Sequence, residues 1–270
     1  MKAEKIYLLD LGWLGGDLGW FLPGAAGGAL TNSNKNVKRT WVEIPVTAAV
    51  VMHKDGVVLF DTGISPLAMK THAPGLMEAF PITKFNDDNF IERQLANIGL
   101  VPGDISFIVI SHLHLDHIGQ AAIFKDYKVP IVVQKRELEY ALSMIWQGKG
   151  GAYDQADLVP LMGASWHPID DKKFELMDGI TLEFTGGHTP GHQVMIAETN
   201  SGSTYVFTGD YIHLPEEHEI EAKGWLLGDA DEWHSYIRKL KLIEKSRKAK
   251  LVISHDPKLW DKYPKGKAID

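Results

Sequence analysis

The sequence predicts an α/β fold, and three observations support this prediction. Short apolar runs rich in β-branched residues recur along the 270-residue chain, amphipathic helical stretches separate several of them, and each cluster of chemically active side chains follows a predicted strand. The sequence has neither an internal repeat nor a low-complexity linker. We therefore predict one β-rich domain over residues 1–270, with its site in loops along one edge of the sheets.

The first half of the chain begins with a predicted strand over residues 4–12. A hairpin follows over residues 47–63, where two apolar runs flank the turn sequence Lys-Asp-Gly. Residues 89–100 have apolar side chains at helical spacing up to Gly99, a residue typical of helix ends. The next elements expected are a strand over 105–112, a strand over 129–134 and a helix over 135–146.

The second half continues this alternation. A strand runs into the glycine-rich turn "TGGHTPGHQ" within residues 179–193, and an Asn-Ser-Gly turn joins strands over 194–199 and 203–210. An amphipathic helix over 231–250 and a strand over 251–256 complete the domain. The basic run in this helix is expected to be a solvated face rather than a binding patch.

Two stretches fit no regular element. Residues 13–36 are rich in glycine and contain Trp13, Trp20 and Phe21, and residues 146–168 mix glycine, proline and aromatic side chains. Long irregular segments in a compact domain are commonly functional. We therefore predict functional loops at both places.

Composition excludes several classes of function. A net charge of −7 argues against a surface that follows nucleic acid. No apolar stretch reaches the roughly 18 residues of a membrane span, and the N-terminal apolar run is too short for a signal peptide, so we expect a cytoplasmic protein. The sequence contains no cysteine, so any metal site must consist of His, Asp and Glu.

The segment "SHLHLDHIG" crowds four polar side chains into six positions: His112, His114, Asp116 and His117. Each needs a polar partner once it leaves water, and a metal ion is the obvious one. On an extended segment His112 and His114 point the same way, because side chains alternate. Asp116 and His117 follow where a helix is expected, so this segment could present two ligands to one ion and two to a neighbour.

Four further candidates each lie just beyond a predicted strand: Asp61 in "LFDTG", His188 in "TGGHTPGHQ", Asp210 in "FTGDYI" and His255 in "ISHDP". Together with "HLHLDH", these motifs resemble in order those of the metallo-β-lactamase superfamily, from about residue 45 to 256. The resemblance implies an αββα four-layer sandwich, in which two mixed sheets lie between helices and metals bind at one edge.

The resemblance also implies a centre of two divalent metal ions, of which Zn²⁺ is the first expectation and Co²⁺, Mn²⁺ or Fe²⁺ suit the same ligands. The ligands implied for the first ion are His112, His114 and His188, and those for the second are Asp116, His117 and His255. Asp210 would bridge the two ions together with a hydroxide.

Two cations about 3.5–4 Å apart would supply hydroxide at neutral pH, so that no serine, cysteine or lysine nucleophile is needed. Asp116 would then carry a proton to the leaving group. Asp61 and His192 are expected to support ligands by hydrogen bonding rather than to bind an ion. The histidines expected at the surface or in packing are His53, His72, His167, His218 and His234.

Within the superfamily the sequence is most similar to the N-acyl homoserine lactonases, through "HTPGHQ", the seven ligands and "ISHD". This similarity implies a quorum-quenching lactonase, in which the metal-bridging hydroxide opens the ring of an N-acyl homoserine lactone or similar lactone. These lactonases carry a tyrosine three residues after the bridging aspartate, where this chain has His213. His213 or the neighbouring Tyr211 is the candidate to bind the lactone carbonyl, unless the substrate differs.

The residues expected to form an apolar wall for a small-molecule lactone or ester are Trp13, Trp20, Phe21, Met144, Trp146 and Tyr153. The same aromatic side chains are equally suited to packing a loop or forming a homodimer contact. Two alternatives remain open. The same machinery could act on another ester, a phosphotriester, a pyridoxolactone or a β-lactam, or the chain could be a non-catalytic metal-binding or sensing protein.

Overall fold

The structure is a computed structural model that describes residues 1–23, 32–33, 35–36 and 39–270. The strands in these residues are β1 (Lys5–Asp17), β2 (Trp41–His53), β3 (Gly56–Phe60), β4 (Ile82–Lys84), β5 (Phe107–Val109), β6 (Ile131–Gln134), β7 (Trp166–Ile169), β8 (Lys173–Met177), β9 (Ile180–Phe184), β10 (Gln193–Glu198), β11 (Thr204–Phe207) and β12 (Lys250–Val252). The α-helices are α1 (Ala68–Thr71), α2 (Pro74–Ala79), α3 (Ile91–Asn97), α4 (Leu115–Ile118), α5 (Lys135–Trp146), α6 (Gln155–Leu158), α7 (Pro215–Ile220), α8 (Ala230–Arg247) and α9 (Leu259–Lys262).

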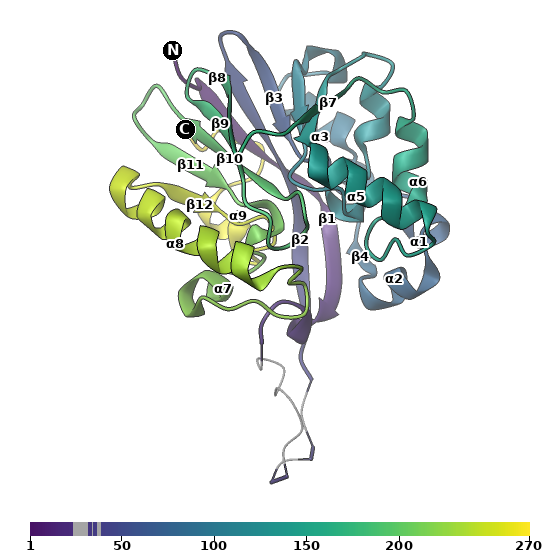
Figure 1. Ribbon diagram of the computed structural model, residues 1–270. Helices are drawn as coiled ribbons and strands as arrows, with labels where there is room; N and C mark the ends of the chain where they lie inside the picture. Colours follow the sequence, from purple (N-terminus) through teal and green to yellow (C-terminus); the bar gives the residue numbers. More distant parts are fainter. Residues whose placement is uncertain (24–31, 34, 37–38) are drawn as a thin grey trace.

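Over the described residues the strands form two sheets (Figure 1). The seven-stranded sheet has the order β4-β1-β2-β3-β5-β6-β7, and the five-stranded sheet has the order β12-β11-β10-β9-β8. Both sheets are mixed. In the first, β2 and β3 pair antiparallel whereas β3 and β5 pair parallel, and in the second β10 and β11 pair antiparallel whereas β11 and β12 pair parallel.

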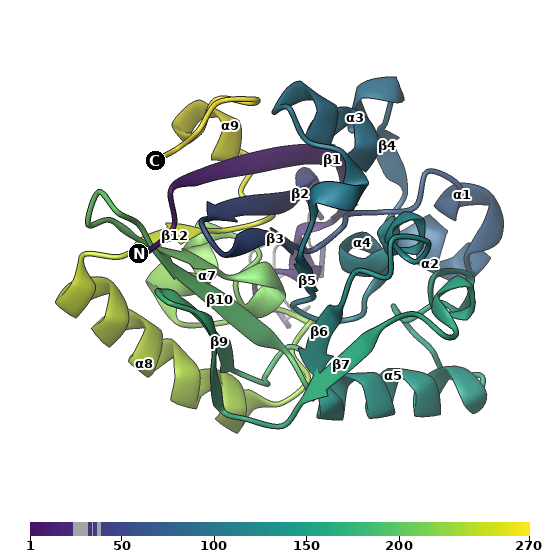
Figure 2. The same ribbon diagram turned by 90° about the horizontal axis from the view of Figure 1, so that it is seen from above.

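Alternation along the strands builds the layers between and outside the sheets. On β10, Met195 and Ala197 face the first sheet, whereas Val194 and Ile196 pack against α8. The outer face of the first sheet packs against α3 and α5, so that the two sheets lie between α8 on one side and these helices on the other (Figure 2). The predicted αββα four-layer sandwich is therefore confirmed.

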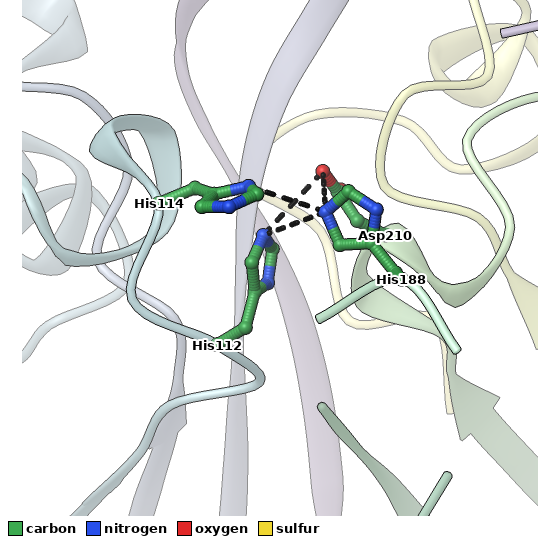
Figure 3. A group of neighbouring side chains, drawn as sticks. All are labelled: His112, His114, His188 and Asp210. Atoms are coloured by element: carbon green, nitrogen blue, oxygen red, sulfur yellow. Dashed lines mark hydrogen bonds and ion pairs between the residues drawn. The ribbon is translucent and has the colours of Figure 1, made fainter. Parts of the chain in front are cut away.

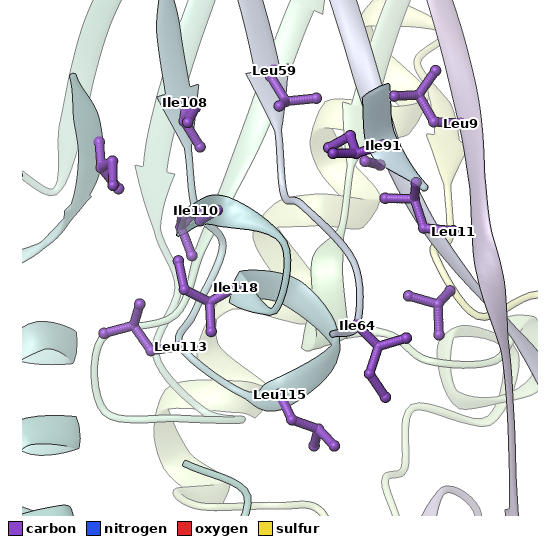
Figure 4. Close-up of a cluster of buried hydrophobic side chains, with 14 of the residues drawn as sticks. Leu9, Leu11, Leu59, Ile64, Ile91, Ile108, Ile110, Leu113, Leu115 and Ile118 are labelled. Carbon is purple, nitrogen blue, oxygen red and sulfur yellow. The ribbon is translucent and has the colours of Figure 1, made fainter. Parts of the chain in front are cut away.

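The apolar residues of the histidine-rich segment pack into the hydrophobic core. Leu113, Leu115 and Ile118 alternate with the polar side chains and are buried in the largest hydrophobic cluster, beside Ile110 (Figure 4). Burial of each such aliphatic side chain contributes about 1.5–3 kcal/mol. The core thus fixes the backbone of this segment, and the intervening histidines and aspartate face the opposite way.

The structure corrects the bounds of both predicted loops. Strand β1 continues through residues 13–17 because they pair with β2, with Leu14 opposite Ile44. Glycine suits this strand because a Cβ at Gly15 would lie 2.6 Å from the Trp41 ring. Residues 24–31 and 34 of the first predicted loop lie outside the described residues.

The second predicted loop, residues 146–168, contains regular structure as well. Helix α6 lies within it, and β7 begins at Trp166, where it extends the first sheet by pairing parallel with β6. The edge position of β7 explains why its sequence lacks the apolar alternation of a buried strand. Within the described residues, no helix is both long and apolar enough to cross a membrane.

Candidate metal centre

All seven predicted ligands meet at one edge of the sandwich. They follow the ends of strands: His112 and His114 come after β5, His188 after β9 and His255 after β12, and Asp210 lies in the 3₁₀ turn Gly209–Tyr211 after β11. Asp116 and His117 come from α4, which continues the histidine segment. They form two adjacent groups, one of His112, His114, His188 and Asp210 and the other of Asp116, His117 and His255.

In the first group three ring nitrogens and one carboxylate oxygen converge (Figure 3). His188 Nε2 lies 3.2 Å from both His112 Nε2 and His114 Nδ1. Asp210 Oδ2 lies 3.4 Å from His188 Nε2 and 3.6 Å from His112 Nε2. A set of three imidazoles with a carboxylate is one that a divalent ion such as Zn²⁺ takes.

The second group faces the other oxygen of the same aspartate. Asp210 Oδ1 lies 2.9 Å from His255 Nε2 and 3.0 Å from His117 Nε2. Asp116 Oδ2 lies 3.4 Å from His255 Nε2, and Asp116 Oδ1 lies 3.7 Å from His117 Nε2. Asp210 therefore presents one oxygen to each group, which is the geometry that a bridging ligand requires.

Backbone carbonyls orient two of the imidazoles. His188 Nδ1 donates to the Leu226 carbonyl at 2.9 Å, and His255 Nδ1 donates to the Pro45 carbonyl at 2.7 Å. With the ring proton held on Nδ1, the lone pair of Nε2 points into the centre. Metal-binding histidines are usually oriented in this way by a partner behind the ring.

A carboxylate and a hydroxyl orient two more imidazoles. Asp61 accepts hydrogen bonds from His117 Nδ1 at 2.8 Å and from Ser111 Oγ at 2.9 Å. Because the Ser111 hydroxyl donates to Asp61, its oxygen is free to accept from His112 Nδ1 at 3.0 Å. Asp61 thus contacts His117 directly and His112 through Ser111, and His192, which lies outside both groups, contacts Thr185 Oγ1 through Nδ1 at 2.7 Å.

Burial favours the uncharged form of the three histidines in the first group. It lowers the pKa of His114 to about 3 and the pKa values of His112 and His188 well below the ordinary value. Burial also opposes the charged form of His117, but the neighbouring Asp210 and Asp116 raise the pKa of His117 well above its ordinary value. Neutral imidazole is the form that binds a metal.

Four buried polar atoms at the centre have no hydrogen-bond partner among the described residues: His117 Nε2, His192 Nε2, His213 Nε2 and Asp210 Oδ1. An unpaired buried polar group costs about 1–3 kcal/mol. A cation placed between the two groups would satisfy the His117 nitrogen and the Asp210 oxygen. The donor set and these unpaired atoms therefore fit divalent cations.

A narrow pocket of about 30 Å³ opens onto the centre. Its polar lining comes from the metal-ligand candidates and His213, and its apolar walls include Leu14, Phe21, Ile44, Phe80 and Leu226. This volume has room for about two water molecules. Of the six residues predicted to contact substrate, Phe21 lines this pocket.

The other predicted wall residues lie elsewhere. Trp20 packs behind the wall against Phe80, with ring centres 5.4 Å apart. Trp13 lies on strand β1 beneath the Lys84 ammonium, which is 4.3 Å from the Trp13 ring centre. Trp146 is 92% exposed at the end of α5, because the helix directs it toward solvent rather than toward the centre.

The two remaining wall candidates are packing residues. Met144, on α5, packs against the hydrophobic core. The Tyr153 ring lies edge-on to His114, with ring centres 4.7 Å apart, and the Tyr153 hydroxyl donates to Glu137 at 3.0 Å. Tyr153 therefore supports a ligand from behind rather than lining the pocket.

Of the two candidates to bind a carbonyl, the structure places only His213 in the pocket. His213 Nε2 lies 3.1 Å from Asp210 Oδ2. The prediction for Tyr211 is wrong, because its hydroxyl donates to the Trp233 carbonyl and its ring packs between Trp233 and Tyr236. The turn after β11 sends the Asp210 and Tyr211 side chains to opposite sides.

Glu137 is a site-supporting residue that the sequence did not reveal. Its buried carboxylate accepts from the Leu113 and Gly191 backbone N–H groups, each at 3.0 Å, and from the Thr189 hydroxyl at 2.7 Å. Glu137 therefore links the segment that carries His112 to the segment that carries His188. A glutamate in the first turn of a helix ordinarily faces solvent, so nothing local distinguishes it.

Known proteins resemble this chain over most of its length. A model of the metallo-beta-lactamase superfamily matches residues 41–255. N-acyl homoserine lactonase AttM from Azorhizobium caulinodans is 30% identical over 234 residues, which cover 83% of this chain and 86% of AttM. N-acyl homoserine lactonase AiiA from Bacillus thuringiensis subsp. kurstaki is 28% identical over 220 residues, which cover 80% of this chain and 82% of AiiA.

Solved structures give the same result for the fold. A quorum-quenching N-acyl homoserine lactone hydrolase superposes with a TM-score of 0.78 at 25% identity, over 100% of this chain and 99% of that chain. An AiiA mutant from B. thuringiensis, with N-decanoyl-L-homoserine bound at its active site, gives 0.78 at 25% identity over 100% of both chains.

Proposed function

Because this chain belongs to the metallo-beta-lactamase superfamily, a family of hydrolases, we propose that it is a lactonase that uses two divalent cations. The proposed substrates are N-acyl homoserine lactones or similar small lactones, the class named for its relatives AttM and AiiA. One observation carries the proposal: the two oxygens of Asp210 face two separate groups of ligands.

The residues of the first group would hold one cation and those of the second group the other, with Asp210 shared between them. We propose Zn²⁺ for both, since histidine and carboxylate ligands without cysteine suit it. When bound, such a pair lowers the pKa of a water molecule and polarises a carbonyl. Asp61, Ser111 and the two backbone carbonyls keep the ligand nitrogens directed inward throughout the reaction.

The chain's own residues would direct the ring opening. Water adds to the lactone carbonyl carbon, the bond from that carbon to the ring oxygen breaks, and the ring oxygen leaves as an alcohol after it gains a proton. Asp116, which belongs to the second group and lines the pocket, would carry this proton. His213, which also lines the pocket, would donate a hydrogen bond to the carbonyl oxygen.

The apolar walls would exclude water from the reacting carbonyl and contact the part of the acyl group next to it. Phe21, Phe80 and Leu226 surround the approach to the polar centre. Apolar lining with few convergent polar groups is typical of sites for small ligands. The homodimer and the cytoplasmic location expected from the sequence stay predictions.

A substrate panel tests the proposal. Zinc-loaded protein should open N-acyl homoserine lactones faster than aryl esters, phosphotriesters, a pyridoxolactone or a chromogenic β-lactam. Asp210→Asn should abolish this activity, whereas Asp126→Asn, at an exposed position, should leave it unchanged. Faster turnover of one of the other classes would overturn the lactone assignment, and no turnover at all would favour a binding or sensing protein.

A further inference from the structure

A buried lysine lies directly behind His213. The side chain of Lys223 is fully buried, and its Nζ contacts the Asp210 carbonyl at 2.6 Å, the Tyr211 carbonyl at 3.2 Å and His213 Nδ1 at 2.8 Å. Glu217, also fully buried, places a carboxylate oxygen 3.3 Å from Nζ. These are four acceptors for the three protons of an ammonium group, and the two nearest are the Asp210 carbonyl and His213 Nδ1.

These contacts decide where His213 carries its proton. An ammonium group only donates, so a ring nitrogen 2.8 Å away must accept. The competing contact, from Nδ1 to Glu217 Oε1, is longer at 3.1 Å, and the other Glu217 oxygen accepts the His213 backbone N–H at 2.9 Å. We infer that Lys223 is a positioning residue that holds His213 in the tautomer with its proton on Nε2.

This arrangement is the reverse of that at the metal-ligand candidates. His117, His188 and His255 each have an acceptor behind Nδ1, which keeps the proton there and leaves Nε2 able to bind a cation. His213 has a donor behind Nδ1, so its Nε2 carries a proton and does not bind a cation. Lys223 therefore distinguishes His213 from its neighbours and makes it a hydrogen-bond donor.

Among the described residues this N–H donor has no hydrogen-bond partner. His213 Nε2 is buried and lines the pocket, and Asp210 Oδ2 lies 3.1 Å away. The Phe21 ring, 5.2 Å away between ring centres, limits its movement on the apolar side. The N–H is available to a neutral oxygen acceptor, which under the proposed function is the substrate carbonyl.

Nitrogen NMR of the zinc-loaded chain tests the tautomer directly. The His213 ring signals are assigned by their loss in His213→Gln. The expected result is a protonated Nε2 and an unprotonated Nδ1, with this preference lost in Lys223→Met. A proton on Nδ1 in the unsubstituted protein would overturn the inference, whether or not Lys223→Met folds.

Kinetics separates this inference from the proposed function. Lys223→Met should lower kcat/KM for a lactone by about 10- to 100-fold, the usual effect of losing an outer partner, while zinc content stays unchanged. The matched control is Lys241→Met, which removes a lysine paired with Glu221 at the surface. Lactone turnover with the proton on Nδ1 would refute the role of Lys223 alone. A proton on Nε2 without lactone turnover would support that role and refute the lactonase.

Discussion

The carboxylate of Asp61 accepts a hydrogen bond of 2.8 Å from Nδ1 of His117, and this bond leaves His117 Nε2 facing Asp210. Asp61 has a backbone φ of +60°, in the left-handed region that few residues other than glycine, asparagine and aspartate adopt. Its other contacts are the Ser111 backbone N–H at 2.7 Å and the Ser111 hydroxyl at 2.9 Å. A strained residue that gathers three donors in this way is typical of a functional site.

Asp61→Asn should weaken the second cation more than the first. Asparagine tolerates the left-handed backbone, but its single acceptor oxygen cannot serve three donors. We expect zinc affinity at the group of His117 to fall by about 10- to 100-fold, with a smaller fall at the other group, which Asp61 contacts only through Ser111. Zinc titration of this variant beside Asp126→Asn measures the effect, and equal affinity in both would remove the supporting role of Asp61.

Phe21→Leu should raise KM for long acyl chains more than for short ones. The smaller side chain keeps the fold packed but leaves the pocket wall with less apolar surface against the acyl group. Each methylene group of the substrate that is no longer buried should cost about 0.8 kcal/mol, which is about fourfold in KM. Trp146→Ala is the control, because Trp146 is 92% exposed and lies away from the pocket. An equal change for short and long chains would mean that Phe21 does not touch the acyl group.

Glu137→Gln should lower the free energy of unfolding. The amide presents N–H groups where the carboxylate accepts from the Thr189 hydroxyl and the Gly191 N–H. Each donor left unpaired should cost about 1–3 kcal/mol, measurable as a lower urea midpoint. Glu139→Gln on the same helix is exposed and should change nothing. Stability equal to that of the unsubstituted protein would show that Glu137 does not fasten the two ligand segments.

Local sequence patterns predicted much of the fold and many of the residues that meet at the candidate metal centre. Helix α5 coincides with its prediction, and the hairpin turns between His53 and Gly56 as expected, because periodicity and turn chemistry are local signals. The edge strands β4, β7 and β8 were not predicted, since edges tolerate polar side chains. Lys223 was not predicted either, because its role depends on a turn that brings it behind His213, ten positions earlier.

The stability of the fold should depend on pH through His72. Burial opposes its charged form, but the hydrogen bond to Asp157 at 2.7 Å and the charge of Asp157 outweigh burial and raise the pKa of His72. A raised folded-state pKa contributes stability below about pH 6.5, the unfolded value, and this is lost as pH rises through the folded value.

The measurement is the free energy of unfolding between about pH 6 and pH 9, a range that brackets the titration of histidine. His72→Gln should show a smaller decline than the unsubstituted protein, whereas His167→Gln, at an exposed position, should retain the full decline. The same decline in both variants would mean that the pair of His72 and Asp157 does not contribute.

Anomalous diffraction from zinc-loaded crystals tests the central claim most directly. Two peaks should appear about 3.5–4 Å apart. One should lie among His112, His114 and His188, the other among Asp116, His117 and His255, with Asp210 between them. A single peak, or none at this edge of the sandwich, would contradict a centre of two cations.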